Sequence, residues 1–241
     1  MNKILIIAKK ELNSFFDSLT AYIMLVAFLG FSGFFTWLYG ADIFLRNQAD
    51  LQVFFGIAYW TLFFFIPAIT MRMLAEENKT GTLELLLTKP VSDWQVVTGK
   101  FTACMMLIII ALLFTLPYYL TIWKLGPVDH GSIFTGYIGL ILLSAAYISI
   151  GLFTSSITNN QIVAFLLALF IGLFFHIIFD VLSGNFTGAA GMVLSYLSTS
   201  SHYDSISRGV LDSKDIIYFL SIIFLSLTAS EIVLSKRNLT D

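Results

Sequence analysis

The segment Glu76–Pro90, EENKTGTLELLLTKP, decides how the rest of this chain is interpreted. It holds three of the 15 acidic residues and lies between two long uncharged runs, residues 51–71 and 101–123. Each run exceeds the about 20 apolar residues that a membrane-spanning helix needs. An ionised group in hydrocarbon costs several kcal/mol, so the charged segment between the runs must be a loop at the membrane surface.

The same segment carries the signals of a turn followed by a short helix. Gly81-Thr82 is a turn pair, and the leucines behind it predict one apolar helical face. Pro90 ends this helix, because proline lacks an amide proton and its ring clashes with the preceding turn. We therefore expect a short amphipathic helix in the loop. The leucines are Leu83, Leu85, Leu86 and Leu87, and the acidic residues are Glu76, Glu77 and Glu84.

Composition places the whole chain in a membrane. Its 241 residues are 58% hydrophobic and 12% charged, with a mean hydropathy of +0.87, whereas soluble domains have about 25% charged residues. A net charge of −2 gives no indication of nucleic-acid binding. The single cysteine, Cys104, excludes an internal disulfide framework and a multi-cysteine metal site, and we predict no metal site.

The hydropathy pattern predicts one all-α domain, residues 1–241, with six transmembrane helices. Prolines predict kinks in the second and third helices, at Pro67 and Pro117. The expected helices are about Ala21–Tyr39, Leu51–Met71, Lys100–Trp123, Ser132–Phe153, Ile162–Leu182 and Lys214–Leu234. No internal repeat is evident.

Residues 1–19 predict an amphipathic helix in the membrane interface. Apolar residues such as Ile4, Ala8 and Leu12 recur at helical spacing, while Lys3 and Lys10 take the other side. Lys9, Lys10 and Glu11 interrupt the apolar run, so it does not form a cleavable signal peptide. A plain surface anchor remains the alternative to a helix with a further role.

The basic residues predict the orientation. Six spans place both termini on one side, and nine of the 13 Lys and Arg residues then fall on that side. By the positive-inside rule, both termini and the Glu76–Pro90 loop are cytoplasmic. The inner residues are Lys3, Lys9, Lys10, Arg72, Lys79, Lys89, Lys100, Lys236 and Arg237, and the outer ones are Arg46, Lys124, Arg208 and Lys214.

Catalytic motifs are missing. Gly99-Lys100 superficially matches a phosphate loop, but Trp94 stands where the first glycine belongs and Phe101 replaces the Ser or Thr. We therefore expect no enzyme activity and no cofactor in this chain. His176 and Asp180 lie one helical turn apart and could interact.

The pattern Glu-Glu, Gly-Thr-Leu-Glu, Leu-Leu and Pro-Val-Ser over residues 76–92 resembles the cytoplasmic coupling loop of ABC-2 type transporter permeases. Within that family, residues 69–101 look most like the gliding-motility-associated ABC transporter permease subunit, the GldF type. The likeness extends through SSITNNQIVAF (155–165) and HYDSISRGVLDSKDIIYFLS (202–221).

This resemblance implies a multi-pass permease of the bacterial inner membrane, which couples ATP hydrolysis by a separate ATPase subunit to transport or export. ATP and Mg would bind in that ATPase. The other implied partners are a second permease subunit, as a homo- or heterodimer, a further gliding-motility membrane protein and membrane lipid, but no nucleic acid.

The resemblance also assigns roles to three groups of residues. The first would form the ATPase-coupling loop, the second an interface helix that touches the ATPase, and the third an outer cap or gate. Apart from the resemblance, the spacing of Arg208 from Asp204 and Asp212 would permit i,i+4 pairs on a helix. Acidic side chains of the first group would pair with basic residues of the ATPase. The groups are Glu76, Glu77, Gly81, Thr82, Glu84, Leu87 and Pro90; Lys9, Lys10 and Glu11; and His202, Asp204, Arg208 and Asp212.

An ion-coupled secondary transporter is the alternative. Such a protein should carry ionisable residues near the membrane centre to bind the coupling ion. Only His176 and Asp180 come near that position, and Glu231 lies toward the inner end of its helix. The sequence therefore favours the permease.

Overall fold

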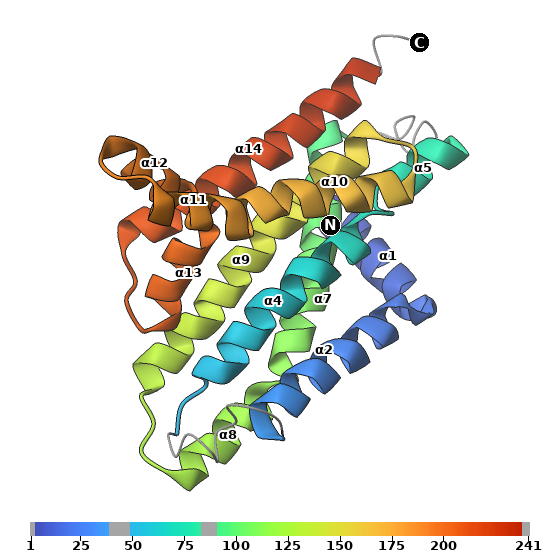
Figure 1. Ribbon diagram of the computed structural model, residues 1–241. Helices are drawn as coiled ribbons and strands as arrows, with labels where there is room; N and C mark the ends of the chain where they lie inside the picture. Colours follow the sequence, from blue (N-terminus) through green and yellow to red (C-terminus); the bar gives the residue numbers. More distant parts are fainter. Residues whose placement is uncertain (1–2, 39–48, 83–90, 238–241) are drawn as a thin grey trace.

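A computed structural model describes residues 3–38, 49–82 and 91–237 of the chain. These residues form helices joined by short connections, with no strand in the described ranges (Figure 1). Six helices are long and apolar enough to cross a membrane, which confirms the predicted class. They are Leu19–Trp37, Gln52–Thr80, Asp93–Leu125, His130–Ile157, Gln161–Asn185 and Ser213–Lys236.

Several of these spans consist of two or more helical segments. The segments, with the labels of Figure 1 where shown, are α1 (Lys3–Asp17), α2 (Leu19–Trp37), α4 (Gln52–Thr70), α5 (Ala75–Thr80), α7 (Asp93–Leu113), α8 (Leu116–Leu125), α9 (His130–Ile157), α10 (Gln161–Leu173), the π-helical turn η1 (Phe174–Ile178), α11 (Phe179–Asn185), α12 (Ala189–Leu197), α13 (Thr199–Ser207) and α14 (Ser213–Arg237).

Helix α9 lies at the centre of the bundle and contacts α4, α7, α10, α13 and α14. It is the most buried of the six spans. Two of its glycines allow α4 to approach closely, since a Cβ at Gly136 would collide with the Phe55 ring and one at Gly151 with Thr70. Small residues at such contacts let membrane helices pack through backbone proximity. The α4–α9 contact is therefore tight along its length.

The third span begins earlier than predicted. We expected it to start at Lys100, but α7 begins at Asp93, because Ser92 and Gln95 form a reciprocal capping box. Lys100 consequently lies two helical turns inside α7, where its side chain is fully buried. The kink expected at Pro117 is confirmed, since α7 ends at Leu113 and α8 starts anew at Leu116.

The fifth span contains a π-helical turn that places His176 toward the bundle. Its Nδ1 lies 2.7 Å from the Tyr147 hydroxyl, and its ring stacks between those of Tyr59 and Phe63, at centroid distances of 4.0 and 4.4 Å. Asp180 instead accepts a hydrogen bond from Ser198. The interaction expected between His176 and Asp180 does not form, because the wider turn removes the α-helical register between them.

Helix α1 confirms the predicted amphipathic helix, with a different division of its faces. Ile7, Ala8 and Phe15 are buried, and a Cβ at Gly99 of α7 would collide with the Ile7 side chain. Leu5 is 50% exposed. Helix α1 thus has two apolar sides. One side packs on α7, and the other is exposed on the surface of the molecule.

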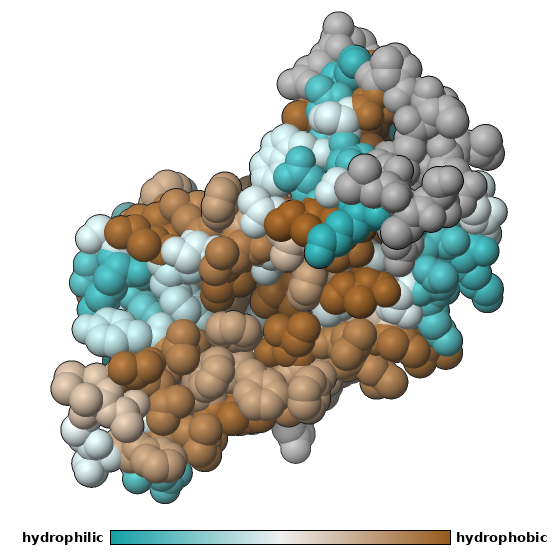
Figure 2. All heavy atoms as spheres, turned by 90° about the horizontal axis from the view of Figure 1, so that it is seen from above, coloured by the Kyte–Doolittle hydropathy of each residue, from teal (hydrophilic) through white to brown (hydrophobic). Residues whose placement is uncertain are grey.

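The outer surface of the bundle matches a hydrocarbon environment. Figure 2 shows hydrophobic residues across the middle of the visible face and hydrophilic residues gathered at two opposite ends. Large apolar side chains on α2, α10 and α14 remain exposed, among them Val26, Leu166 and Leu225. A helix whose apolar residues face outward as well as inward is typical of a membrane span.

Candidate functional site

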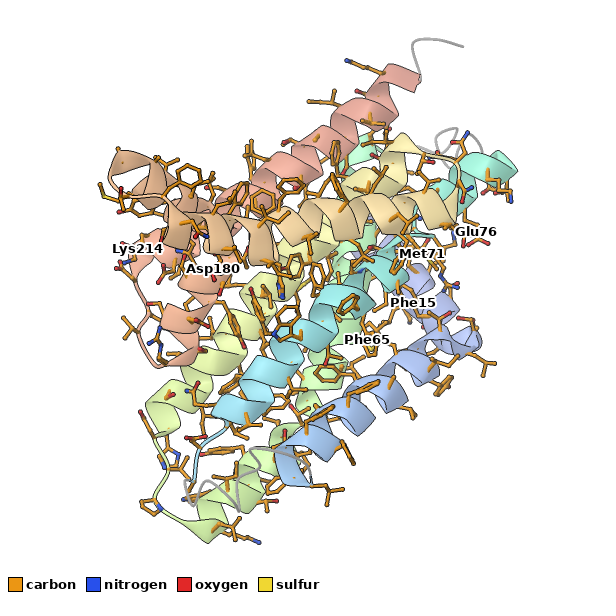
Figure 3. The ribbon with its side chains drawn as sticks, in the orientation of Figure 1. Phe15, Phe65, Met71, Glu76, Asp180 and Lys214 are labelled. Carbon is orange, nitrogen blue, oxygen red and sulfur yellow. The ribbon has the colours of Figure 1, made fainter. Side chains whose placement is uncertain are left out.

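Three helices meet at the end of the bundle that carries Glu76–Thr82, the described part of the predicted loop. Helix α1 packs against α7, and α5 continues from α4 beside them (Figure 1). Figure 3 shows Phe15, Met71 and Glu76 at this same end of the molecule. Segments far apart in the sequence thereby form one polar surface.

Lys100 joins all three helices through its ammonium group. Its Nζ lies 2.8 Å from Glu77 Oε1 of α5 and 3.3 Å from Glu11 Oε1 of α1. The Lys100 side chain is fully buried, and those of Glu11 and Glu77 are only 13% and 18% exposed. Removing one member of such a buried ion pair leaves an uncompensated charge, so the cluster couples the positions of α1, α5 and α7.

A break between α4 and α5 is fastened by one hydroxyl of α9. The Ser155 Oγ accepts hydrogen bonds from the amides of Leu74 and Ala75 and donates one to the Met71 carbonyl, each 3.0 Å long. The end of one helix and the start of the next leave backbone groups without helical partners. Ser155 supplies those partners and fixes the direction in which α5 leaves the bundle.

Gly81 ends α5 in the left-handed region, with φ +70°. Glycine adopts this conformation without steric cost, which makes it the usual residue after a helix end. Thr80 supports the turn, because its Oγ1 donates to the Glu76 carbonyl and lies 2.9 Å from Thr82 Oγ1. The turn predicted at Gly81 is confirmed. The helix predicted after it, with Glu84, Leu87 and Pro90, lies outside the described residues.

The two neighbouring glutamates of the segment have different surroundings. Glu76 is exposed, and no ion pair involving it occurs in the described ranges. Glu77 turns inward to Lys100, so its carboxylate is already engaged within the chain, while the pairing of Glu76 with an ATPase stays a prediction. In α1, the Lys9 side chain is exposed. The Lys10 Nζ lies 3.5 Å from Glu11 Oε1.

A cavity of about 340 Å³ opens between α1 and α5. The Arg72 guanidinium carbon lies 5.1 Å from the centre of the Phe15 ring, and its Nη2 donates to Ser18 Oγ at 3.5 Å. Neither these contacts of Arg72 nor the ion pairs of Lys100 were predicted from the sequence, where both residues counted toward the orientation of the chain. The cavity is lined by Lys10, Glu11, Ser14, Arg72, Met73, Glu76, Glu77, Thr80 and Thr82.

At the opposite end, α12, α13 and the start of α14 surround a second cavity, of about 380 Å³. His202 Nδ1 lies 2.6 Å from Asp215 Oδ1, and its Nε2 lies 3.0 Å from the Tyr196 carbonyl. A carbonyl only accepts, so Nε2 carries a proton and both ring nitrogens are engaged. The His202 ring also stacks on Tyr218 at 4.1 Å. This arrangement holds three helices together and leaves no free nitrogen to act as a base.

The charge pairs predicted around Arg208 are wrong. Arg208 Nε donates to the backbone carbonyl of Asp204, while Asp212 pairs with Lys214 at 3.2 Å. Helix α13 ends at Ser207, so Arg208 and Asp212 never share a helix.

The two aspartates beside Arg208 differ in acidity. Burial raises the pKa of the Asp204 carboxyl, and the hydrogen bonds from Lys214 lower the pKa of the Asp212 carboxyl.

Comparison with known proteins identifies related permeases. A sequence profile described as "ABC-2 family transporter protein" matches residues 5–235. Two relatives, both named "Probable multidrug ABC transporter permease YbhR", come from Escherichia coli strain K12 and Escherichia coli O157:H7. Each is 29% identical over 101 residues, which is 42% of this chain and 27% of the relative. The match thus spans about a quarter of the length of these curated relatives.

Proposed function

The chain belongs to the ABC-2 family of transporter proteins, and we propose that residues 1–241 form one permease domain that couples ATP hydrolysis in a separate subunit to transport. The observation that carries this proposal is the Lys100 cluster beside the exposed Glu76. A partner that binds α5 would move Glu77, and the buried ion pair would carry that movement to α7 and α1. ATP and Mg would be held by the partner.

The proposal is tested by ATP hydrolysis and by recovery of the ATPase. The chain purified alone is expected to hydrolyse no ATP, because no phosphate loop is present in its sequence. In the complex purified from native membranes, Glu76→Lys should reduce ATPase recovery, since like charges across an interface cost several kcal/mol.

The matched control is Lys124→Glu, which reverses an exposed charge in α8. It should leave ATPase recovery unchanged. Steady ATP turnover by the isolated chain, or full recovery with Glu76→Lys, would contradict the proposed coupling. Transport driven by an ion gradient without nucleotide would instead support a secondary transporter.

We propose a gliding-motility or surface-secretion system as the setting, with a second permease subunit and a further membrane protein of that system as partners. The support is the resemblance of residues 69–101 to the GldF type. The matched relatives are named as probable multidrug permeases, which supports drug export as the second candidate function. Mass spectrometry of proteins that co-purify from the native membrane separates the two settings, and an efflux assay with fluorescent drugs tests the second.

We also propose an inner-membrane location with both termini in the cytoplasm, which rests on the distribution of basic residues. In a Cys104→Ala background, an impermeant thiol reagent applied to intact cells should label cysteines introduced at Pro127 and Ser213. Cysteines at Ser92 and Asn160 should react only after the cells are opened. Labelling of Ser92→Cys from outside would reverse the proposed orientation.

A further inference from the structure

We propose that the cavity between α1 and α5 receives an acidic side chain of the ATPase subunit, whose carboxylate pairs with Arg72. This inference rests on the proposed function and specifies the chemistry of the partner. It reverses the charges of the pairing expected from the sequence for the coupling loop, in which acidic side chains of this chain meet basic residues of the ATPase.

The charges that line the cavity leave Arg72 without a counterion. Glu11 and Glu77 are engaged by Lys100, and Glu11 also by Lys10. Among the residues that the structure describes, no carboxylate lies within ion-pair distance of Arg72. The internal pairs therefore neutralise most of the cavity and leave one cation, Arg72, together with the exposed Glu76.

Arg72 is held in a fixed place, and within the described part of the chain most of its donors have no acceptor. The guanidinium lies over the Phe15 ring, which is only 1% exposed and forms a rigid base. Arginine has five N–H donors, and the contact with Ser18 uses one of them. A stacked, planar guanidinium is prepared to bind a carboxylate through two parallel hydrogen bonds.

The same charges favour a protein carboxylate over a lipid phosphate. A phosphate headgroup in the cavity would bring its negative charge close to Glu76, which pairs with no cation among the described residues. A protein surface can place an acidic residue opposite Arg72 and a basic one opposite Glu76. Such complementary arrangement of opposite charges fixes the orientation of a partner.

The position of Arg72 gives this contact a mechanical consequence. Arg72 lies in the turn between the end of α4 at Thr70 and the start of α5 at Ala75, next to the Met71 carbonyl held by Ser155. A partner that binds Arg72 and moves therefore displaces the inner end of α4 directly. The Lys100 cluster would carry the movement of α5 to α7 at the same time.

The first test measures ATPase recovery with the complex purified from native membranes. Removing one partner of a buried charge pair in an interface costs about 2–5 kcal/mol, and 1.4 kcal/mol is tenfold, so Arg72→Gln should lower recovery at least about tenfold. Arg72→Glu should abolish it, and Arg72→Lys should retain part of it. The matched control is Lys236→Glu, an exposed charge reversal near the end of α14, which should keep recovery within about twofold of wild type.

The second test identifies what occupies the cavity. A photo-crosslinking residue replaces Ser14, which lines the cavity from α1, and mass spectrometry locates the crosslinked partner. The expected product is an ATPase peptide that contains Asp or Glu. Crosslinking to phospholipid alone, with full ATPase recovery by Arg72→Glu, would overturn the inference.

Failure of this inference can be told apart from failure of the proposed function. If Glu76→Lys loses the ATPase while the Arg72 variants keep it, the docking surface stands and the role of Arg72 is refuted. If no ATPase accompanies the wild-type chain, both are refuted. Melting of each variant, followed through the buried thiol of Cys104, separates lost docking from lost folding.

Discussion

Replacing Lys100 with Met is expected to lower the free energy of unfolding by about 3–5 kcal/mol, because it leaves the largely buried carboxylate of Glu77 without its cation and Glu11 paired with Lys10 alone. The Lys100 side chain is fully buried, and it is the common partner of Glu11 and Glu77. The loss should loosen the attachment of α1 and α5 to α7, so the complex should also lose ATPase recovery.

Thermal unfolding in detergent measures this effect. Cys104 is the one cysteine of the chain and is buried, so a thiol-reactive dye reports its exposure as the protein unfolds. The control is Lys214→Met, which removes the solvent-exposed ion pair with Asp212 and should leave the melting temperature close to that of the wild type. If the Lys100→Met protein is as stable as this control, the cluster does not hold the helices together.

A second substitution separates the charge effect from lost packing. Adding Glu77→Gln to Lys100→Met removes the carboxylate that has lost its cation. Part of the lost stability should return, because two residues in direct contact are energetically coupled by about 0.5–3 kcal/mol. No recovery in the double variant would indicate that Lys100 acts through the packing of its methylene chain alone.

The six spans could be predicted from the sequence because hydropathy and length are local properties of each run. The Lys100 cluster could not, because Glu11 lies 89 residues away and meets Lys100 only after α1 packs on α7. The sequence signal nearest to it was the Ser92 capping box, which extends α7 and places Lys100 inside the helix. If the helix is taken to begin at Lys100 instead of Asp93, Lys100 is expected at the membrane surface.

Contacts between helices at the outer end were also not predicted from the sequence. His202 was predicted as part of an outer cap, but its partner, Asp215, was missed because it belongs to the next helix. The expected pairs of Arg208 failed, since they assumed a helix that continues past Ser207. Regular spacing predicts contacts within one helix, whereas the contacts that connect helices depend on packing that spacing does not encode.

The helix break at Met71–Ala75 is the place where binding at α5 becomes movement of α4. Replacing Ser155 with Ala is expected to destabilise this break, because the buried amides of Leu74 and Ala75 lose their acceptor. Each buried donor left without a partner costs about 1–3 kcal/mol. The surface of α5 keeps its residues, so the ATPase should still bind, while substrate-stimulated ATP hydrolysis by the complex should fall.

Ser149→Ala provides the matched control on the same helix. Ser149 is also fully buried in α9, but its hydroxyl bonds only the Ala146 carbonyl of its own helix. Loss of the Ser149 hydroxyl should have a small effect on the melting temperature and on stimulated ATP hydrolysis. The comparison uses melting followed through Cys104, ATPase recovery and stimulated hydrolysis for both variants. Equal results for Ser155→Ala and Ser149→Ala would show that the hydroxyl does not fasten the break, and that α5 is held by the Lys100 cluster alone.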